Sequence, residues 1–284
     1  MKRILTAILL VAFFINPLSA QELTGTLQQI KKSGKIKVGF RQDQPPLSFL
    51  GKDGKPAGYS IDICKNIVAE IRNKISGDIK VEYIPVTAED RFHALADKKV
   101  DILCGSTTIT HSRSELVDFT QLTFVTGASF MTVKGKKIRG NFSGKKIGVL
   151  KNTTTAIELE KLFVETKTDA NIVFLNSMTE GLKALKKEQI DALAADQIVL
   201  IGLALNEENP NNFSILPNLF SYELLALAVR RNDADFRLIA NRVISNLCQS
   251  KQILNIYDKW LGQFSSFRPV VFETLIELNA AISE

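Results

Sequence analysis

The sequence predicts an α/β protein made of two similar units with a cleft between them. Short apolar runs typical of buried strands alternate with segments whose apolar residues recur at helical spacing. This alternation begins near residue 35 and starts again near residue 146. The 284 residues also exceed what one hydrophobic core usually requires. Strands separated by helices favour parallel β-α-β units, so we expect such units in each half.

The first twenty residues have the features of a secretory signal peptide. Lys2 and Arg3 precede an apolar run over 4–15, and a cleavage site can follow Ser19 and Ala20. The run is shorter than the about 20 apolar residues that a membrane span needs, which disfavours an uncleaved anchor. We therefore expect residues 1–20 to be removed and the mature protein to be periplasmic.

The first unit begins with a strand over 35–40. A helix over 60–75 follows, because Ile61, Cys64, Ile67, Val68, Ile71 and Ile75 share one face. A strand over 79–86 leads to a capping-box pattern at 87–90, which opens a helix reaching about residue 97. A short buried strand over 100–103 completes the unit.

The second unit repeats this order and returns to a C-terminal helical region. Its expected elements are a strand over 146–150, a helix capped at 155–158 and running to about 165, a strand over 172–175, a helix over 181–187, a strand over 190–194 and a helix over 197–205. A strand over 224–229 and helices over 235–249 and 253–260 follow. The chain therefore carries enough elements for two sheets.

The segment CGSTTITHSR at 104–113 indicates a site for a carboxylate. We expect Ser106 and Thr108 on a tight turn directly after the strand over 100–103, with Arg113 delivered by the same segment. Hydroxyl groups, backbone N–H groups and a guanidinium that converge on one point suit a carboxylate ligand. The segment thus predicts capture of a small molecule that carries a carboxylate.

Other polar residues follow expected strands at the same kind of position. Arg41 follows the strand over 35–40, Thr153–Thr155 follow the strand over 146–150, and Asp196 follows the strand over 190–194. In open α/β sheets, ligands bind beyond the carboxyl ends of the strands. These residues are therefore expected to line the same cleft as Ser106, Thr108 and Arg113.

Composition excludes several other kinds of site. The formal charge of +6 includes Lys2 and Arg3, and the remaining excess is lysine spread along the chain, without the clustered basic and aromatic residues of a nucleic-acid surface. His93 and His111 have no partners at metal-ligand spacing, and no nucleophile–base pair is apparent. We expect no catalytic residues, no metal and no cofactor.

The three cysteines leave two readings open. An exported protein can pair two of Cys64, Cys104 and Cys248 and leave the third free. Cys64 lies in a helical pattern and Cys104 ends a strand, so both also fit buried, small apolar residues. A structural role is expected rather than thiol chemistry.

Six motifs, in this order and spacing, resemble those of the periplasmic solute-binding proteins of polar amino-acid ABC transporters, the bacterial extracellular solute-binding family 3. The motifs are 58–63 (GYSIDI), 101–113, 117–120 (VDFT), 144–149 (GKKIGV), 191–192 (DA) and 257–260 (YDKW). The resemblance covers nearly all of the mature chain. Within the family, CGSTT at 104–108 and the tail beyond Trp260 resemble the glutamate/aspartate-binding branch.

The resemblance implies a two-lobed periplasmic-binding-protein fold of type II, with the ligand in the cleft. Lobe 1 would be discontinuous, over 21–122 and 226–284, and lobe 2 would span 128–220. Hinge segments near 123–127 and 221–225 would join them and allow closure around the ligand. A membrane permease would recognise the closed form, and a monomer is expected.

The resemblance also implies residue roles. Arg113 would pair with the α-carboxylate of a free amino acid, with Ser106 and Thr108 as hydrogen-bonding neighbours, and Asp196 would hold the α-ammonium group. Thr154 and Thr155 match the turn of the second lobe whose N–H groups reach the carboxylate on closure.

Arg41 and Arg91 match positions that the acidic-amino-acid branch places around the side-chain carboxylate. Three arginines against Asp196 would leave the cleft net positive, which favours an anionic ligand. Ala88 and Met178 depart from that branch, which has serine and histidine there. Leu227 stands near the place of that branch's disulfide partner for Cys104, so no bridge from Cys104 to that strand is expected.

Simpler structural roles compete with these assignments. Arg113 could pair with Asp118, and Asp196 could cap the helix that starts at Gln197. Arg41 and Arg91 could be solvated surface residues.

Three functions are compatible with such a scaffold. The first is delivery of a polar, acidic amino acid to an ABC permease. The second is an exported enzyme resembling cyclohexadienyl dehydratase, which would need a general acid in the cleft. The third is a ligand sensor, which the absence of a signalling segment disfavours. We expect the first, a binding protein and not an enzyme.

Overall fold

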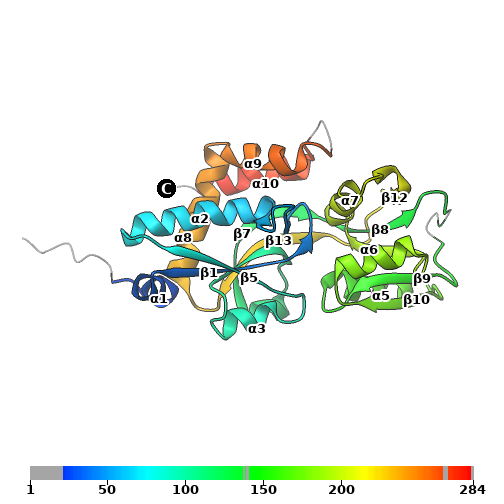
Figure 1. The fold of residues 1–284 in the computed structure, drawn as a ribbon, viewed down its shortest axis with the longest axis horizontal. Helices are drawn as coiled ribbons and strands as arrows, with labels where there is room; N and C mark the ends of the chain where they lie inside the picture. Colours follow the sequence, from blue (N-terminus) through cyan, green and yellow to red (C-terminus); the bar gives the residue numbers. More distant parts are fainter. Residues whose placement is uncertain (1–21, 137, 139–140, 265–267, 283–284) are drawn as a thin grey trace, which may run out of the picture.

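The computed structural model describes residues 22–136, 138, 141–264 and 268–282. The predicted signal peptide lies outside these residues. None of the helices in the described ranges combines the length and apolar character that a membrane span requires. Two five-stranded sheets, each with its own helices, form the two halves of the elongated molecule in Figure 1.

The first sheet is mixed rather than purely parallel. Its strands, in spatial order, are β5 (Lys80–Pro85), β1 (Lys35–Phe40), β6 (Ile102–Thr108), β13 (Glu223–Arg230) and β7 (Val117–Thr126). β1 is parallel to β5 and β6, as the β-α-β pattern predicts. β13 is antiparallel to both of its neighbours, because the chain re-enters this sheet from the other half of the molecule.

Helices cover both faces of this sheet. They are α1 (Gly25–Ser33), α2 (Tyr59–Ile75), α3 (Arg91–Ala96), α4 (His111–Ser114), α8 (Ala234–Gln249), α9 (Gln252–Leu261) and α10 (Val270–Ala280). The predicted apolar face of α2 is buried, with Ile61, Ile67 and Ile71 completely inaccessible. A small antiparallel sheet of β2 (Asp43–Gln44), β3 (Ser48–Leu50) and β4 (Pro56–Ala57) leads from β1 into α2.

The second sheet repeats the mixed arrangement. Its strands, in spatial order, are β10 (Asn171–Leu175), β9 (Lys146–Leu150), β11 (Ala192–Asp196), β8 (Ala128–Val133) and β12 (Phe213–Ile215). Its helices are α5 (Thr154–Glu165), α6 (Met178–Lys186), α7 (Gln197–Leu205) and the short 3-10 helix Pro210–Asn212. β8 is antiparallel to β11, while β9 is parallel to β10 and β11.

The chain crosses between the sheets twice, and the two crossings touch. The first crossing passes from β7 through Gly127 into β8, and the second lies between β12 and β13. A Cβ atom at Gly127 would come within 2.3 Å of the carbonyl oxygen of Ser221. Only glycine therefore allows the backbones of the two crossings to approach so closely.

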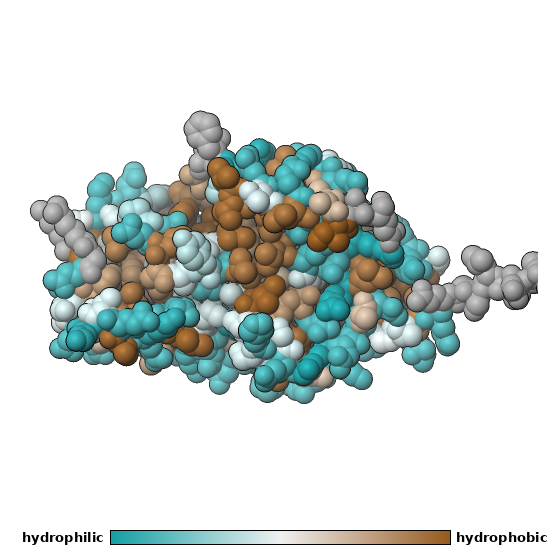
Figure 2. Space-filling view, turned by 180° about the vertical axis from the view of Figure 1, so that it is seen from behind, coloured by the Kyte–Doolittle hydropathy of each residue, from teal (hydrophilic) through white to brown (hydrophobic). Residues whose placement is uncertain are grey.

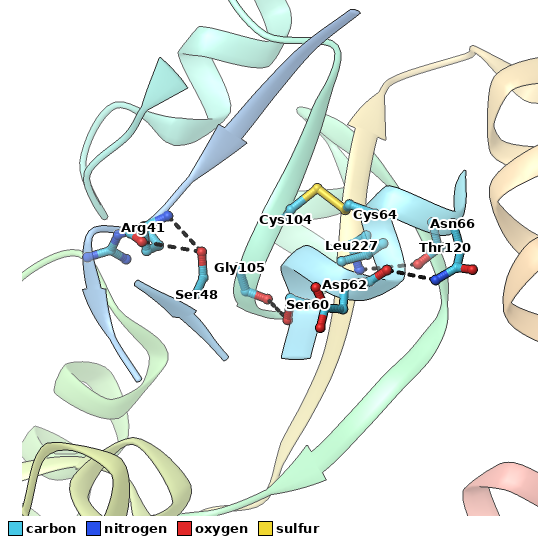
Figure 3. The surroundings of a disulfide bond; sticks show 10 residues. All are labelled: Arg41, Ser48, Ser60, Asp62, Cys64, Asn66, Cys104, Gly105, Thr120 and Leu227. Atoms are coloured by element: carbon cyan, nitrogen blue, oxygen red, sulfur yellow. Dashed lines mark hydrogen bonds between the residues drawn. A yellow bond between two sulfur atoms is a disulfide. The ribbon is translucent and has the colours of Figure 1, made fainter. Parts of the chain in front are cut away.

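A disulfide joins Cys64 of α2 to Cys104 of β6 (Figure 3). Of the two alternatives left open by the sequence, the disulfide is therefore the one observed, and Cys64 and Cys104 are not free thiols. Cys248 is a buried free thiol. The prediction that Cys104 is not bridged to the strand carrying Leu227 is confirmed. In Figure 3 the bridge lies beside a hydrogen bond from Ser60 Oγ to the carbonyl oxygen of Gly105, so two links fasten α2 to β6.

The surface seen from behind is mostly hydrophilic, with a band of hydrophobic residues across its middle (Figure 2). The exposed apolar side chains of the molecule include Val270, Val271 and Leu278 of α10. The opposite face of α10 carries the buried Phe272, Leu275 and Ile276, which pack this helix onto the core of the first half.

Candidate functional site

A polar cavity lies between the two sheets, at the carboxyl ends of strands from both. The space free of protein atoms around it, including the part open to solvent, is about 440 Å³. Its lining residues are Arg41, Gln44, Arg91, Ser106, Thr108, Arg113, Leu150, Thr153, Thr154, Thr155, Met178, Ala194, Ala195, Asp196 and Val199. All eight residues expected at the site from the sequence are therefore brought together around one space.

Ser106 and Thr108 lie on a strand, not on a tight turn. β6 continues to Thr108, and Thr108 is paired with Leu225 of the neighbouring β13. The expectation of a turn was wrong because β13 keeps pairing beyond the apolar part of β6, with an irregularity between Ala226 and Ala228. Ser106 Oγ lies 2.5 Å from Gln44 Oε1, so the small sheet also contributes to the cavity wall.

Arg113 projects from the short helix α4 and is fixed by two local bonds. The Thr110 side chain accepts a hydrogen bond from the backbone N–H of Arg113, and Arg113 Nη1 donates to the carbonyl oxygen of Thr108 at 2.7 Å. Asp118 instead approaches Arg237, at 3.6 Å. The alternative of an Arg113–Asp118 pair is therefore absent, and the guanidinium lines the cavity.

Arg41 and Arg91 are buried rather than solvated. Arg41 Nη2 lies 3.5 Å from Asp43 Oδ1, and burial lowers the pKa of Arg41 although Asp43 and Asp90 oppose this shift. The backbone of Arg41 is held by Ser48, whose Oγ accepts from the Arg41 N–H at 3.0 Å (Figure 3). The alternative of two solvated surface arginines is therefore contradicted by their burial.

Arg91 has no carboxylate within ion-pair distance among the residues that the structure describes. Its Nη1 donates to the carbonyl oxygen of Ala88, and its guanidinium lies over the ring of Phe92. Burial, reinforced by the charges of Arg113 and Arg41, lowers the pKa of Arg91 to about 8. This buried cation is thus poorly compensated by the protein itself.

Phe92 was not expected at the site from the sequence. The Arg91 guanidinium carbon lies 4.4 Å from the centre of this ring, and that of Arg113 lies 5.5 Å from it. The negative face of an aromatic ring attracts guanidinium groups, so Phe92 helps to hold two like charges near each other.

The second half of the molecule contributes the start of α5. Thr153 is the N-cap, and its side chain accepts from the backbone N–H of Ala156 at 3.2 Å. The cap therefore lies two residues before the position predicted from the sequence. Thr154 and Thr155 occupy the first turn, where unpaired N–H groups and the helix dipole favour an anion.

Asp196 lies where β11 ends and α7 begins. It occupies the N-cap position of α7, but its side chain makes no capping hydrogen bond, so the alternative of a purely capping role is not realised. Burial, together with the nearby charge of Glu223, raises the pKa of Asp196 to about 7, although Arg113 opposes this shift. The carboxyl group is thus available to a cationic partner in the cavity.

The prediction that the cleft is net positive did not include two carboxylates, Glu223 and Asp43. Glu223 was not recognised in the sequence, yet it is 1% exposed and favours the charged form of Arg113. With Asp43 beside Arg41 and Glu223 behind the cavity, three carboxylates face three arginines. The site is therefore balanced overall, and its uncompensated positive charge is concentrated at Arg91.

Three contacts across the cleft describe a closed arrangement. Asp43 Oδ2 accepts from the backbone N–H of Met178 at 2.6 Å, and the Lys151 ammonium lies 3.0 Å from the Glu89 carboxylate. At the third contact, a Cβ atom on Gly202 of α7 would come within 2.3 Å of the carbonyl oxygen of Pro45.

The described residues contain no group of three or more His, Cys, Asp or Glu side chains placed to hold a metal ion. The cavity offers instead guanidinium groups, hydroxyls, helix N–H groups and one carboxyl group. Such a set suits a small ligand that carries both anionic and cationic groups.

The known proteins to which this chain is similar in sequence are solute-binding proteins. A profile of the bacterial extracellular solute-binding proteins, family 3, matches residues 36–263. The L-glutamate/L-aspartate-binding protein of Pseudomonas aeruginosa is 30% identical over 264 residues, covering 92% of this chain and 87% of the relative. The putative amino-acid ABC transporter-binding protein YhdW of Escherichia coli is 32% identical over 83% of this chain and 70% of its own length.

Solved structures agree on the fold. A solute receptor for L-cysteine from Neisseria gonorrhoeae superposes with a TM-score of 0.74 at 27% identity, covering 86% of this chain and 97% of the receptor. The two-lobed periplasmic-binding-protein fold is thereby confirmed. Both sequence relatives are named as binding proteins, one of them of an ABC transporter, which confirms the expectation of a binding protein rather than an enzyme. The chain belongs to the bacterial extracellular solute-binding proteins, family 3.

Proposed function

We propose that this protein is the periplasmic component of an amino-acid ABC transporter and that it captures a free amino acid with an acidic side chain. The lobes close on the ligand, and a membrane permease receives it from the closed form. Relatives named for glutamate and aspartate binding, at about 30% identity, support this class of ligand. The protein would work as a monomer after removal of residues 1–20.

The observation that carries the proposal is the buried Arg91, which has no ion pair among the described residues and lines the same cavity as Arg113 and Asp196. Arg41, Arg91 and Arg113 lie on elements of the first half, and Asp196 lies on the second half. A zwitterion requires one cation and one anion a few ångströms apart in a partly desolvated site.

The main-chain groups of the ligand would engage both halves. Arg113 would hold the α-carboxylate, with Ser106 and Thr108 as hydrogen-bonding neighbours. Thr154 and Thr155, in the first turn of α5, would reach the same carboxylate as the lobes close. Asp196 would hold the α-ammonium group, which requires its charged form.

The side-chain carboxylate of the ligand would compensate Arg91. Arg41 already has Asp43 as a neighbour, whereas Arg91 has no ion pair among the described residues. An added carboxylate would therefore relieve more unfavourable charge at Arg91 than at Arg41. Apolar walls from Leu150, Met178 and Val199 would accommodate the methylene groups between the two carboxylates.

The proposal includes the division into lobes. Residues 21–122 and 226–284 would form lobe 1 and residues 128–220 lobe 2, with hinge segments near 123–127 and 221–225. The contact between the crossings at Gly127 and Ser221 supports a hinge in which both segments move together.

Calorimetric titration of the mature protein tests the proposal. L-Glutamate and L-aspartate are expected to bind with a dissociation constant of about 1 µM and to outcompete L-glutamine and L-asparagine. Arg113→Ala is expected to weaken binding by about a hundredfold, because a charge-assisted pair is lost. Arg91→Gln should abolish the preference for the acids, while Arg237→Gln, at a partly exposed arginine that lies near Asp118 and does not line the cavity, should leave it unchanged.

A preference for glutamine or for a bulky apolar amino acid would refute the acidic specificity. Unchanged affinity in Arg113→Ala would refute the assignment of the α-carboxylate site.

A further inference from the structure

Glu223 lies directly behind the wall of the cavity. It is the first residue of β13, at the end of the second crossing, and its side chain is almost completely buried. The cavity-lining residues include its neighbours Thr108 and Thr154 but not Glu223 itself. Glu223 can therefore influence a ligand through the residues that it binds and through its charge, but not by direct contact.

One oxygen of this carboxylate connects the two halves of the molecule. Glu223 Oε2 accepts from Thr108 Oγ1 at 2.6 Å and from Thr154 Oγ1 at 2.8 Å. Thr108 ends β6 of the first sheet, whereas Thr154 opens α5 beside the second sheet. The two hydroxyls are themselves 3.3 Å apart, so the three groups form a compact cluster across the cleft.

The other oxygen connects the two crossings. Ser221 Oγ donates to Glu223 Oε1 at 2.8 Å and accepts from the backbone N–H of Ala128 at 3.2 Å. Ser221 belongs to the second crossing and Ala128 follows the first, beside the close approach at Gly127. One buried side chain is thus bonded, directly or through Ser221, to both walls of the cavity and both connecting segments.

We propose that Glu223 is a positioning residue for lobe closure, which holds Thr108 and Thr154 together across the cleft and fixes both crossings in the closed geometry. The inference rests on the proposed function, since it concerns closure around a bound amino acid. It adds a residue that does not touch the ligand.

Three features distinguish this role from simple packing. The hydroxyls that Glu223 binds belong to opposite lobes, so opening must break at least one of the two bonds. A carboxylate that accepts several hydrogen bonds holds its partners in one orientation, which a neutral group does less strongly. Its charge also acts on the site, since it favours the charged form of Arg113 and the neutral form of Asp196.

A double-mutant cycle tests the connection between Glu223 and Thr154. The variants are Glu223→Gln, Thr154→Val and the double variant, each titrated with L-glutamate at neutral pH. Each single change is expected to weaken binding by about tenfold or more, and the double change by little more than the larger single effect. Independent, multiplicative effects would overturn the proposal.

The pH dependence of the affinity provides a second test. If Glu223 only packed against its neighbours, replacing it would not change this pH dependence. Among the described residues, Glu223 on β13 and Arg113 on α4 are the charged groups that shift the pKa of Asp196.

In Glu223→Gln the pKa of Asp196 should fall, because a nearby negative charge is removed. The pH below which the affinity declines should therefore be lower than in the wild type. Glu223→Asp should weaken binding, because its shorter side chain reaches the hydroxyls less well. Since it keeps the charge, the pH at which the affinity declines should remain that of the wild type. If the affinity of Glu223→Gln declined at the same pH as that of the wild type, the proposal would be contradicted.

Glu158→Gln is the matched control, because Glu158 lies on the same helix as Thr154 and pairs with Lys161 rather than across the cleft. It is expected to leave affinity and pH profile unchanged. Circular dichroism and thermal unfolding of each variant verify that it folds.

Small-angle scattering separates this inference from the proposed function. If the wild type bound no amino acid, the proposed function would fail, but the ligand-free proteins could still be compared. A larger radius of gyration in Glu223→Gln than in the wild type would support a closure role. Identical radii in the absence of a ligand that binds would overturn it.

Discussion

Asp196 is a carboxyl group whose charge depends on what the cavity contains. In the empty cavity its pKa is raised to about 7 by burial and by Glu223, against a usual value of 3.8. A bound ammonium group would favour the charged form and lower this pKa again. The affinity for an amino acid is therefore linked to pH near neutrality.

The first prediction concerns this linkage. Below about pH 7, the affinity of the wild type should fall by about tenfold for each pH unit, because the ligand must displace a proton from Asp196. Calorimetric titrations from about pH 5 to 8 check this. Uptake of protons on binding at low pH, or an affinity independent of pH, would contradict it.

The same residue should limit the stability of the ligand-free protein. Between the usual and the raised pKa, the folded state binds more protons at Asp196 than the unfolded state does, so this contribution to stability falls as the pH rises to about 7. Asp196→Asn is expected to raise the melting temperature at neutral pH while it abolishes ligand binding. A lower melting temperature than the wild type would mean that the Asp196 charge is already compensated in the ligand-free form.

Single residues were predicted well where the chemistry is visible in the sequence and poorly where it depends on tertiary contacts. Arg113 and Asp196 follow strands, a position that the α/β pattern makes informative. Glu223, Asp43 and Phe92 each have a partner that is distant in the chain, namely Thr108, Met178 and Arg113. No local signal marks Glu223, because its role arises only when Thr108 and Thr154 come together.

At the scale of elements, segments with a clear apolar run between turn residues agree with the sequence. α7 and the strands β1 and β9 have the predicted bounds, since apolar runs and turn residues define them locally. β7 was not assigned from the residues, because polar and apolar residues are mixed along this edge strand. The extension of β6 to Thr108 was missed because it depends on pairing with β13, more than a hundred residues later.

The disulfide between α2 and β6 leads to a prediction of its own. It closes a loop of 40 residues, and such a cross-link stabilises the folded state by about 4 kcal/mol in the chain-entropy description. The variant Cys64→Ala/Cys104→Ala should lose about this amount in urea unfolding without reductant. Reductant should bring the wild type toward the variant and leave the variant unchanged. A loss below about 1 kcal/mol would show that strain or residual structure offsets the bridge.

At the scale of the whole molecule, closure depends on close contact between the halves. Gly202 of α7 lies against the backbone of Pro45, where a methyl group would collide with the carbonyl oxygen. Alanine is favoured over glycine inside a helix, so the second half itself should not be weakened by this change.

A prediction at this scale uses the contact between Gly202 and Pro45. Gly202→Ala should weaken binding of an acidic amino acid by about tenfold or more and leave the ligand-bound protein with a larger radius of gyration, because overpacking costs about 1–3 kcal/mol. Calorimetry and small-angle scattering measure the two effects. Gly77→Ala, at a position with no crowding, is the control. Wild-type affinity and compactness in Gly202→Ala would show that the halves adjust without cost.

The bond between Asp43 and the Met178 amide has a consequence for observing the protein at work. This N–H group begins α6 and has its partner in the opposite half, so opening should return it to water. Its rate of hydrogen–deuterium exchange should therefore slow when ligand is added, while amides in the middle of β9 keep their rate. The exchange rate of this one amide thus measures the fraction of molecules in the closed form without any added label.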